Sequence, residues 1–311
     1  MAENFTEVLK GLYLDPEIPL ALYVFDLTVN AVFSILTIIG NVLIMAALRK
    51  IHLTQVHTVF KAFLFNLSLA DLGVGLVVQP LYISAVLTAM SGFRDASRIL
   101  GALFYLGNWF LPNVSFLFLT LIALDRFLVL HLRLRYRNLV TLKKVVILLL
   151  IMWFVTFAGT MLIIYDNRIY NIVANFGLAV CLSLTTYCYL KIYLTLRRHD
   201  KSVREQSPLE TVYATSRIQP QSGKSFNVLR FKRSVWNMFY VYVAFVLCYL
   251  PLFCILIVIH VRGVDRTTKI FRFLGATLIF INSSLNPLLY CWKIREIRRV
   301  VLKTLSNVIC L

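Results

Sequence analysis

Seven long apolar runs dominate this sequence and limit what it can fold into. Each is long enough for a helix to cross the hydrocarbon core of a bilayer, which takes about 20 apolar residues. They contain too few turn residues for the strands of a membrane barrel, which are about 10 residues long and alternate in polarity. We therefore predict an all-α integral membrane protein, a seven-transmembrane-helix bundle with helices over residues 20–48, 59–87, 99–130, 144–164, 170–196, 234–260 and 267–292.

Composition and charge support this class and suggest an orientation. The chain is 59% hydrophobic, whereas soluble domains carry about 45–50% apolar residues. Of its 32 Lys and Arg residues, 23 fall in the tail and in the connections after the first, third and fifth runs. Because basic loops stay cytoplasmic, we predict an extracellular N-terminus and a cytoplasmic C-terminus. The same distribution fits anionic inner-leaflet membrane lipid as a partner better than nucleic acid, which we do not expect.

The chain divides into three parts. Residues 1–19 form a polar extracellular segment with a glycosylation sequon at Asn4. No signal peptide is evident before the first helix, so we expect that helix to direct insertion. Residues 20–292 form the transmembrane domain, in which the cytoplasmic connection 199–230 is expected to be disordered because it is polar and holds Pro208 and Pro220. Residues 293–311 predict an amphipathic helix on the inner leaflet and a short tail.

Cysteine and histidine positions argue against a disulfide framework and against catalysis. All six cysteines fall in helices or in the tail, so we predict no extracellular disulfide. Cys310, beside the basic tail, is a candidate for palmitoylation, with an unmodified thiol as the alternative. The five histidines show no metallohydrolase spacing, and no Ser-His-Asp set lies at one depth. We therefore expect no enzyme and no required cofactor.

Asp71 stands in the middle of the second run, where an isolated carboxylate costs a few kcal/mol or more. It must face the bundle interior and have a partner. Oxygen ligands around a single carboxylate suit a small hard cation such as sodium. The alternative is a hydrogen-bonded polar cluster that only packs helices, or a protonated aspartate. Candidate partners at matching depth are Ser115, Asn282, Ser283, Asn286 and Asn41.

Each run also carries one short motif. These are Gly40-Asn41-Val42, residues 67–71, Asp125-Arg126-Phe127, Trp153, Tyr189, Cys248-Tyr249-Leu250-Pro251 and Asn286-Pro287-Leu288-Leu289-Tyr290. In this order and at these depths, the motifs resemble the rhodopsin-like (class A) family of G-protein-coupled receptors over nearly the whole chain. The basic amphipathic segment after Tyr290 is similar to the eighth helix of that family.

The resemblance implies a plasma-membrane receptor that couples an extracellular ligand to a heterotrimeric G-protein, with arrestin and receptor kinases as further partners. Asp71 and its candidate partners match the allosteric sodium pocket of the family. A second group matches the residues that rearrange when the sixth helix swings outward. This group comprises Asp125, Arg126, Tyr189, Tyr249, Pro251, Pro287 and Tyr290.

Several positions depart from the family pattern. Phe127 replaces the usual tyrosine, and Tyr249 stands where a tryptophan is typical. Phe231 falls where many relatives have an acid that holds Arg126. Losing a contact of the inactive state shifts the population toward the active state, so we predict ligand-independent signalling.

The outer loops and nearby positions indicate which branch of the family the chain resembles. Gly101 replaces the usual disulfide cysteine, and Cys181 replaces the usual proline of the fifth helix. These absences and the very short loop near Asp166 resemble the melanocortin, lipid and adenosine receptor branch. A melanocortin ligand is not predicted, because Leu81 and Gly101 are apolar where those receptors place acids.

The ligand pocket implied by the resemblance is mainly aromatic. Asn108 stands where amine receptors carry an aspartate, so we expect a neutral small or lipid-like ligand. The alternative for any one aromatic is that it simply packs the bundle. A transporter or channel would need repeats or a charged pore, and neither is visible; an opsin would need a lysine near Ile281. The predicted pocket residues are Gln79, Tyr82, Tyr105, Asn108, Trp109, Pro112, Phe253 and Phe280.

Overall fold

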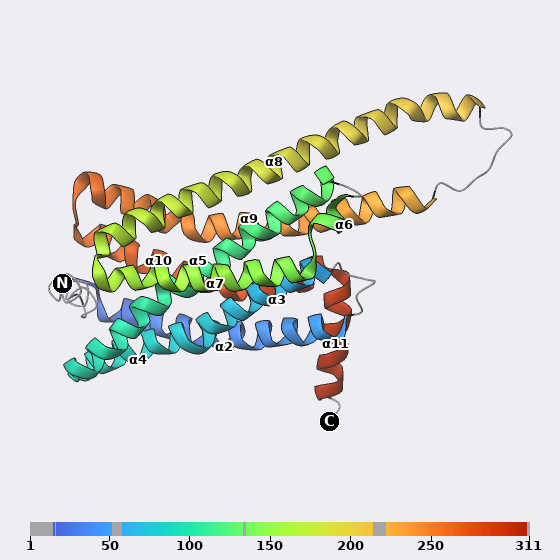
Figure 1. Ribbon diagram of the computed structural model, residues 1–311. Helices are drawn as coiled ribbons and strands as arrows, with labels where there is room; N and C mark the ends of the chain where they lie inside the picture. Colours follow the sequence, from blue (N-terminus) through green and yellow to red (C-terminus); the bar gives the residue numbers. More distant parts are fainter. Residues whose placement is uncertain (1–14, 16, 52–57, 133–134, 214–221, 310–311) are drawn as a thin grey trace.

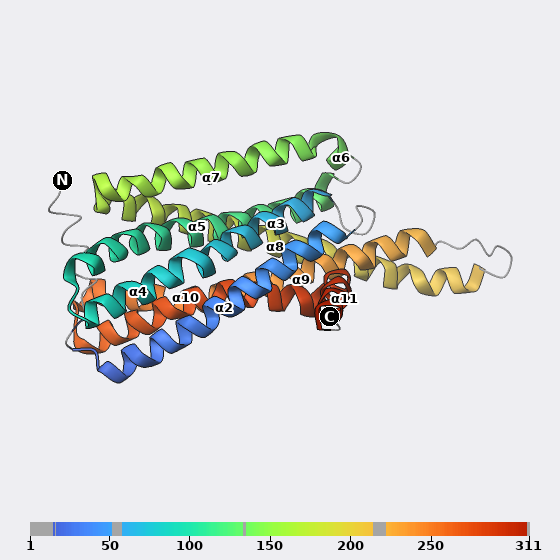
Figure 2. The same cartoon turned by 90° about the horizontal axis from the view of Figure 1, so that it is seen from below.

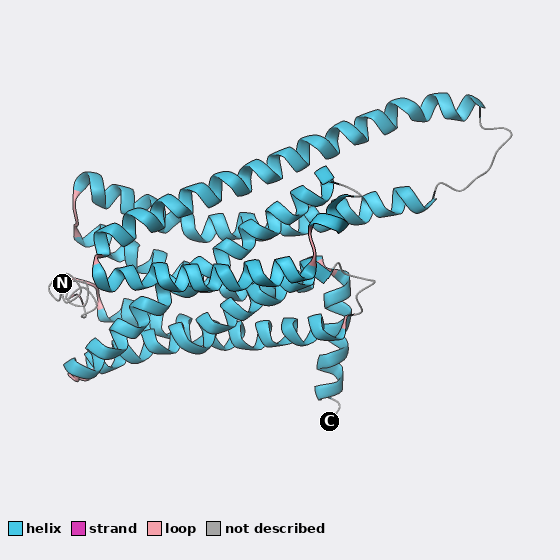
Figure 3. Cartoon of the chain, viewed as in Figure 1, coloured by secondary structure: helices cyan, strands magenta, loops and turns pink. Residues whose placement is uncertain are grey.

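The computed structural model describes residues 15, 17–51, 58–132, 135–213 and 222–309, and these form helices joined by short turns (Figures 1 and 3). No strand occurs in these residues. The helices are α2 (Leu20–Lys50), α3 (Thr58–Gly73), the π-helix η1 (Val74–Val78), α4 (Gln79–Met90), α5 (Arg94–Leu132), α6 (Tyr136–Leu139), α7 (Leu142–Tyr165), α8 (Asn167–Tyr213), α9 (Ser222–Arg262), α10 (Arg266–Lys293) and α11 (Arg295–Ile309).

The seven predicted membrane helices are confirmed. Seven segments are long and apolar enough to cross a bilayer: α2, the continuous α3–η1–α4 unit, α5, α7, most of α8 and α9, and α10. They lie alongside one another in both views, while α11 turns away from the bundle axis (Figures 1 and 2). We call the end with the α4–α5, α7–α8 and α9–α10 turns the N-terminal end, and the end with α11 the C-terminal end.

The structure has helix over much of residues 199–230, the segment for which the sequence predicts disorder. α8 continues to Tyr213 and α9 begins at Ser222, so both extend beyond the bundle in Figure 1. A membrane helix already supplies the costly nucleus, and each further residue adds one hydrogen bond. The extension is rich in Arg, Lys, Glu, Gln and Leu, which favour helix. Polarity was therefore a poor guide to disorder next to an existing helix.

The second membrane helix is interrupted by the π-helix η1. Pro80 follows within the first turn of α4; a proline has no N–H, and its ring clashes with the carbonyl four residues earlier. A wider turn before Pro80 relieves that clash, which accounts for a π-turn at this place. Ser34 of α2 donates from Oγ to the Gly75 carbonyl at 2.8 Å, so one carbonyl of this turn is paired with a neighbouring helix.

α5 runs through the middle of the bundle, in contact with α3, α4, α7 and α8. Large apolar side chains such as Phe154, Phe176 and Leu250 stay exposed on the outside, where a bilayer would cover them. α2 and α10 approach closely at Gly40. A Cβ atom added to Gly40 would lie 2.9 Å from Cβ of Pro287, so this crossing depends on the missing side chain.

Candidate functional site

Asp71 lies near the end of α3, three residues before the π-helix, and is 0% exposed. Ser115 of α5 donates to Oδ1 at 3.0 Å, and Asn286 of α10 donates from Nδ2 to Oδ2 at 2.7 Å. The Ser283 hydroxyl adds a further hydrogen bond to the carboxylate. Asn41 of α2 donates to the Ser283 carbonyl at 3.2 Å. Side chains of α5 and α10 thus bind the carboxylate of α3 directly, and Asn41 of α2 joins the network through Ser283.

The surroundings of Asp71 also hold spare acceptors. The sixth predicted member, Asn282, is buried, and its Oδ1 has no hydrogen-bond partner among the described residues. The Oδ1 atoms of Asn41 and Asn286 are likewise buried without a partner in that part of the chain. An anionic carboxylate beside neutral hydroxyl and amide oxygens is the donor set that a small hard cation prefers.

Arg126 and Asp125 lie side by side at the C-terminal end of α5, and both are buried. Arg126 donates from Nε to Asp125 Oδ2 at 2.9 Å, and its Nη2 contacts the same oxygen. Tyr136 of α6 donates to the other carboxylate oxygen, and burial, with the nearby charge of Asp125, raises the pKa of the Tyr136 hydroxyl. The guanidinium also lies 4.4 Å from the ring centre of Phe60. Sequence reasoning identified the acid–arginine pair but missed Tyr136 and Phe60.

An aromatic stack connects α9 to α5. Tyr249 stacks on Phe245 with ring centres 4.0 Å apart, and Phe245 stacks on Phe116 at 4.5 Å. Pro251 lies two residues beyond Tyr249, inside α9. A proline interrupts the hydrogen-bond ladder at one place, so the helix can bend there while the stack follows. This geometry suits the lever role predicted for Tyr249 and Pro251.

Tyr189 and Tyr290 lie in the same apolar core at the C-terminal half of the bundle. Tyr290 is 0% exposed, and its hydroxyl has no partner among the described residues. Pro287 lies one turn earlier inside α10. A buried phenol hydroxyl without a hydrogen-bond partner costs free energy. A second conformation of the receptor in which the Tyr290 hydroxyl is paired would avoid that cost.

The predicted ligand residues divide into two groups. Tyr105, Asn108 and Trp109 of α5 are partly exposed, and Phe253 of α9 is half exposed. Trp109 packs edge-on against Tyr105 and Tyr170, at 6.3 Å and 5.3 Å. These side chains remain accessible in the half of the bundle nearer its N-terminal end.

Gln79, Pro112 and Phe280 are buried instead, and Tyr82 packs against Phe104 and Phe280. Gln79 is 0% exposed and donates from Nε2 to the Asn30 carbonyl at 3.3 Å. The π-turn just before Gln79 rotates the residues that follow it, which spacing on a regular helix does not anticipate. In this structure these four residues pack within the bundle, and their ligand role remains a prediction.

Sequence reasoning also missed a second buried carboxylate, Asp26 of α2. It is 1% exposed, and Tyr82 of α4 donates to its Oδ2 at 2.5 Å. Asn30 donates to its Oδ1 at 3.1 Å, and the Thr277 hydroxyl of α10 donates to the same atom. The rule that singled out Asp71 applies equally to Asp26, so this group was visible in the first apolar run.

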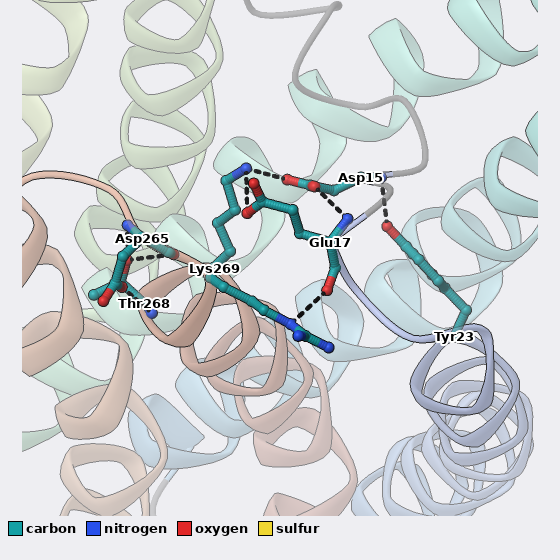
Figure 4. Close-up of polar contacts among 7 residues, drawn as sticks. Asp15, Glu17, Tyr23, Asp265, Thr268 and Lys269 are labelled. Atoms are coloured by element: carbon teal, nitrogen blue, oxygen red, sulfur yellow. Dashed lines mark hydrogen bonds and ion pairs between the residues drawn. The ribbon is translucent and has the colours of Figure 1, made fainter.

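At the N-terminal end, the segment before α2 is tied to the start of α10 (Figure 4). The Nζ atom of Lys269 lies 3.0 Å from Asp15 and 2.9 Å from Glu17. Arg266 donates to the Glu17 carbonyl at 3.2 Å, and the Asp15 N–H donates to the Tyr23 hydroxyl at 2.8 Å. The Glu17 backbone N–H and then Lys269 hold the pKa of Asp15 below its ordinary value. We call this contact the N-terminal strap.

Three predicted features lie outside the described residues or side chains. Asn4, the glycosylation position, and Cys310, the palmitoylation position, both fall in undescribed segments. The side chain of Phe231 is also outside the described part. The other five cysteines (Cys181, Cys188, Cys248, Cys254 and Cys291) are free thiols.

The sequence comparisons agree with this geometry. The family described as "7 transmembrane receptor (rhodopsin family)" matches residues 40–168 and 162–290, most of the helical bundle. The chain is 27% identical to the adenosine receptor A2a of Cavia porcellus over 90% of its own length and 72% of that receptor. It is 24% identical to the adenosine receptor A3 of Ovis aries, covering 90% and 89%. For the human histamine H2 receptor the identity is 25%, covering 87% and 76%.

Such receptors transmit signals and are not enzymes, which agrees with the absence of a catalytic set in the sequence. The family model spans the six residues that converge around Asp71 and the Asp125–Arg126 pair. The chain belongs to the rhodopsin family of seven-transmembrane, G-protein-coupled receptors.

Proposed function

We propose that this receptor binds a small, neutral or lipid-like extracellular ligand at the N-terminal half of the bundle and activates a heterotrimeric G-protein by outward movement of α9. The observation that carries the proposal is the arrangement of Arg126. Its guanidinium pairs with Asp125 on its own helix, and no described acid of α9 contacts it. α9 is therefore free of an ionic tie to α5 in the described part of the chain, and its outward movement breaks no such bond.

Ligand-independent signalling follows from the same arrangement. Phe231 supplies no carboxylate at the position where relatives clamp the arginine. A missing contact of the inactive state raises the population of the active state. We therefore propose measurable basal activity of this receptor.

The proposal that the ligand is neutral rests on the charge of the side chains near the ligand site. Asn108 is the polar group of α5 near Trp109, and it carries no negative charge to pair with an ammonium. Asp26 is closer to the N-terminal end, but its oxygens already accept hydrogen bonds from Tyr82, Asn30 and Thr277. A cationic ligand would have to displace those donors, whereas a neutral aromatic or lipid-like ligand can use the Trp109 and Tyr105 rings.

A sodium ion at Asp71 is proposed as an allosteric ligand rather than a cofactor. Asp71 and Ser115 would hold it, with the unpartnered amide oxygens of Asn41, Asn282 and Asn286 nearby. A bound cation would neutralise the buried carboxylate and keep α3, α5 and α10 together. Sodium should then stabilise wild-type receptor at constant ionic strength, and Asp71→Asn should remove that dependence.

The proposed location is the plasma membrane, with the N-terminus outside and α11 on the cytoplasmic leaflet. The excess of Lys and Arg at the C-terminal end supports this orientation. Arrestin and receptor kinases are proposed partners at the same end, as membrane lipid is for α11. An epitope at the N-terminus should be stained on intact cells, and one at the C-terminus only after permeabilisation.

The test of the receptor proposal is nucleotide exchange on purified G-proteins by membranes that carry the chain. Arg126→Ala should reduce basal exchange about ten-fold or more, because it removes the buried cation at the C-terminal end of α5, where the G-protein is proposed to bind. Arg135→Ala is the matched control, since Arg135 is an exposed cation nearby. Equal exchange by wild type and Arg126→Ala, at matched surface expression, would contradict the proposal.

A further inference from the structure

A groove of about 450 Å³ separates α8 from α9 in the C-terminal half of the bundle. Its walls are residues 186–197 of α8 and 235–242 of α9. Five aromatic side chains line it. Tyr189 contacts Phe239 and Tyr242, each at 5.5 Å between ring centres, and Tyr193 contacts Trp236 at 6.2 Å. The buried rings of Tyr189 and Tyr242 close the inner side of the groove.

The other side of the groove faces the membrane. Leu190 is 54% exposed, Tyr193 is 45% exposed and Trp236 is 37% exposed. All three line the groove and belong to segments long and apolar enough to cross a bilayer. Water is scarce at this depth, so an apolar groove that opens sideways is filled by the hydrocarbon of the membrane.

One end of the groove is charged. Arg197 is the one ionic residue among the described lining residues, and it lies next to the end of the span, at Arg198. Thr186 and Arg197 are eleven residues apart on α8, or about 16 Å along a helix. That distance suits an acyl chain whose polar end reaches the membrane surface. A guanidinium there pairs with a phosphate through two parallel hydrogen bonds.

The charge around this end selects the lipid class. Lys191, which lies 5.6 Å from the ring centre of Tyr187, is a further cation on the same part of α8. No described residue that lines the groove is acidic. A net negative headgroup is therefore favoured over a zwitterionic or neutral one.

We propose that this groove is a binding site for one anionic phospholipid, with an acyl chain against the exposed sides of Leu190, Tyr193 and Trp236 and the phosphate on Arg197. Tyr189 forms part of the wall, so the lipid occupies the space between α8 and the helix whose movement is proposed to activate the receptor. The lipid site itself does not depend on that proposal.

The experiment uses the full chain in nanodiscs with photoreactive lipids, and peptide mass spectrometry maps the labelled residues. Phosphatidylserine with a diazirine acyl chain should label residues 186–197 and 235–242 about ten-fold more than phosphatidylcholine with the same chain. Arg197→Gln should reduce this labelling to the phosphatidylcholine level. Arg198→Gln is the matched control, because it removes the same charge from the neighbouring position, which does not line the groove.

A second pair of variants tests the groove by shape. Leu190→Trp fills it and should abolish labelling, whereas Leu184→Trp adds the same ring at another exposed position of α8 and should not. Equal labelling by both lipids, or equal losses in Arg197→Gln and Arg198→Gln, would overturn the proposal. Labelling that unlabelled cholesterol displaces, and unlabelled phosphatidylserine does not, would also overturn it in favour of a sterol. None of these readouts requires signalling.

Discussion

Asp26 illustrates how much a single buried residue can connect. Its carboxylate accepts hydrogen bonds from α2, α4 and α10, through Asn30, Tyr82 and Thr277. The nearby Gln79 keeps its Oε1 buried without a partner in the described part of the chain. A buried charge is expensive unless it is well paired, so the three donors are what allow Asp26 to remain in the bundle.

Asp26→Ala should therefore destabilise the receptor. The change leaves the Tyr82 hydroxyl unpaired in the interior, at about 1–3 kcal/mol, whereas the Thr277 hydroxyl keeps the Phe273 carbonyl at 3.4 Å. Removal of the buried charge offsets part of that cost, so we expect a net loss of about 1–3 kcal/mol. Thermal unfolding of purified receptor measures it, with Asp95→Ala as control because that carboxylate is 95% exposed. An unfolding midpoint equal to that of wild type would show that the cluster is not stabilising.

The crossing of α2 and α10 is the clearest prediction between elements. Gly40→Ala would place a methyl group 2.9 Å from Cβ and 3.0 Å from Cγ of Pro287, a ring that cannot rotate away. The expected loss is about 1–3 kcal/mol, typical of overpacking. Gly159→Ala is the matched control, since nothing lies within 4 Å of its added Cβ, and helix propensity favours alanine there by about 1 kcal/mol. Unfolding midpoints that move together would contradict this account of the crossing.

The N-terminal strap should respond to acid. The pKa of Asp15 is lowered in the folded state by the Glu17 N–H and by Lys269, so the folded protein holds the ionised form more strongly than the unfolded chain does. This contribution is fully present above the ordinary aspartate pKa of 3.8 and is lost as the pH falls through the lower folded value. Asp15→Asn should reduce hydrogen-exchange protection around Tyr23 at pH 5. The difference from wild type should shrink as the pH falls below 3.8; a constant difference would rule out this ionisation.

Helices were predictable from the sequence because each is specified locally. A run of about 20 apolar residues is sufficient to indicate a span, and Pro80 explains the π-turn once it is seen. The helical extension to Tyr213 was missed, because polar composition says little about a segment that continues an existing helix.

Side-chain contacts between different helices were only partly predictable from the sequence. Asp71 and Asn286 were found together because family motifs mark both, and Ser115 was added because it lies at a matching depth. No motif marks Asp26, Tyr82 and Thr277, which are up to 251 residues apart in sequence, and their meeting depends on helix rotation. The same rotation, set by the π-turn, brings Gln79 and Tyr82 against Asn30 and Asp26 of α2.

At the scale of the whole molecule, we expect the polar network at Asp71 to be coupled to the region around Arg126, where the G-protein is proposed to bind. Asn286 belongs to that network through its 2.7 Å hydrogen bond to Asp71, and Tyr290 lies one turn further along α10 toward the C-terminal end. Coupling of this kind is a free energy shared by two sites. It should therefore be lost when Asn286 can no longer bind the carboxylate.

Basal nucleotide exchange by Asn286→Ala, divided by surface expression, tests this claim most directly. The account predicts at least a ten-fold loss of exchange with less than a two-fold loss of expression, by the relation between free energy and population. Ser284→Ala is the control, because this buried hydroxyl bonds only to the Ile281 carbonyl of its own helix at 2.7 Å, as far as the structure describes it. Equal exchange per receptor in Asn286→Ala and wild type would contradict the account.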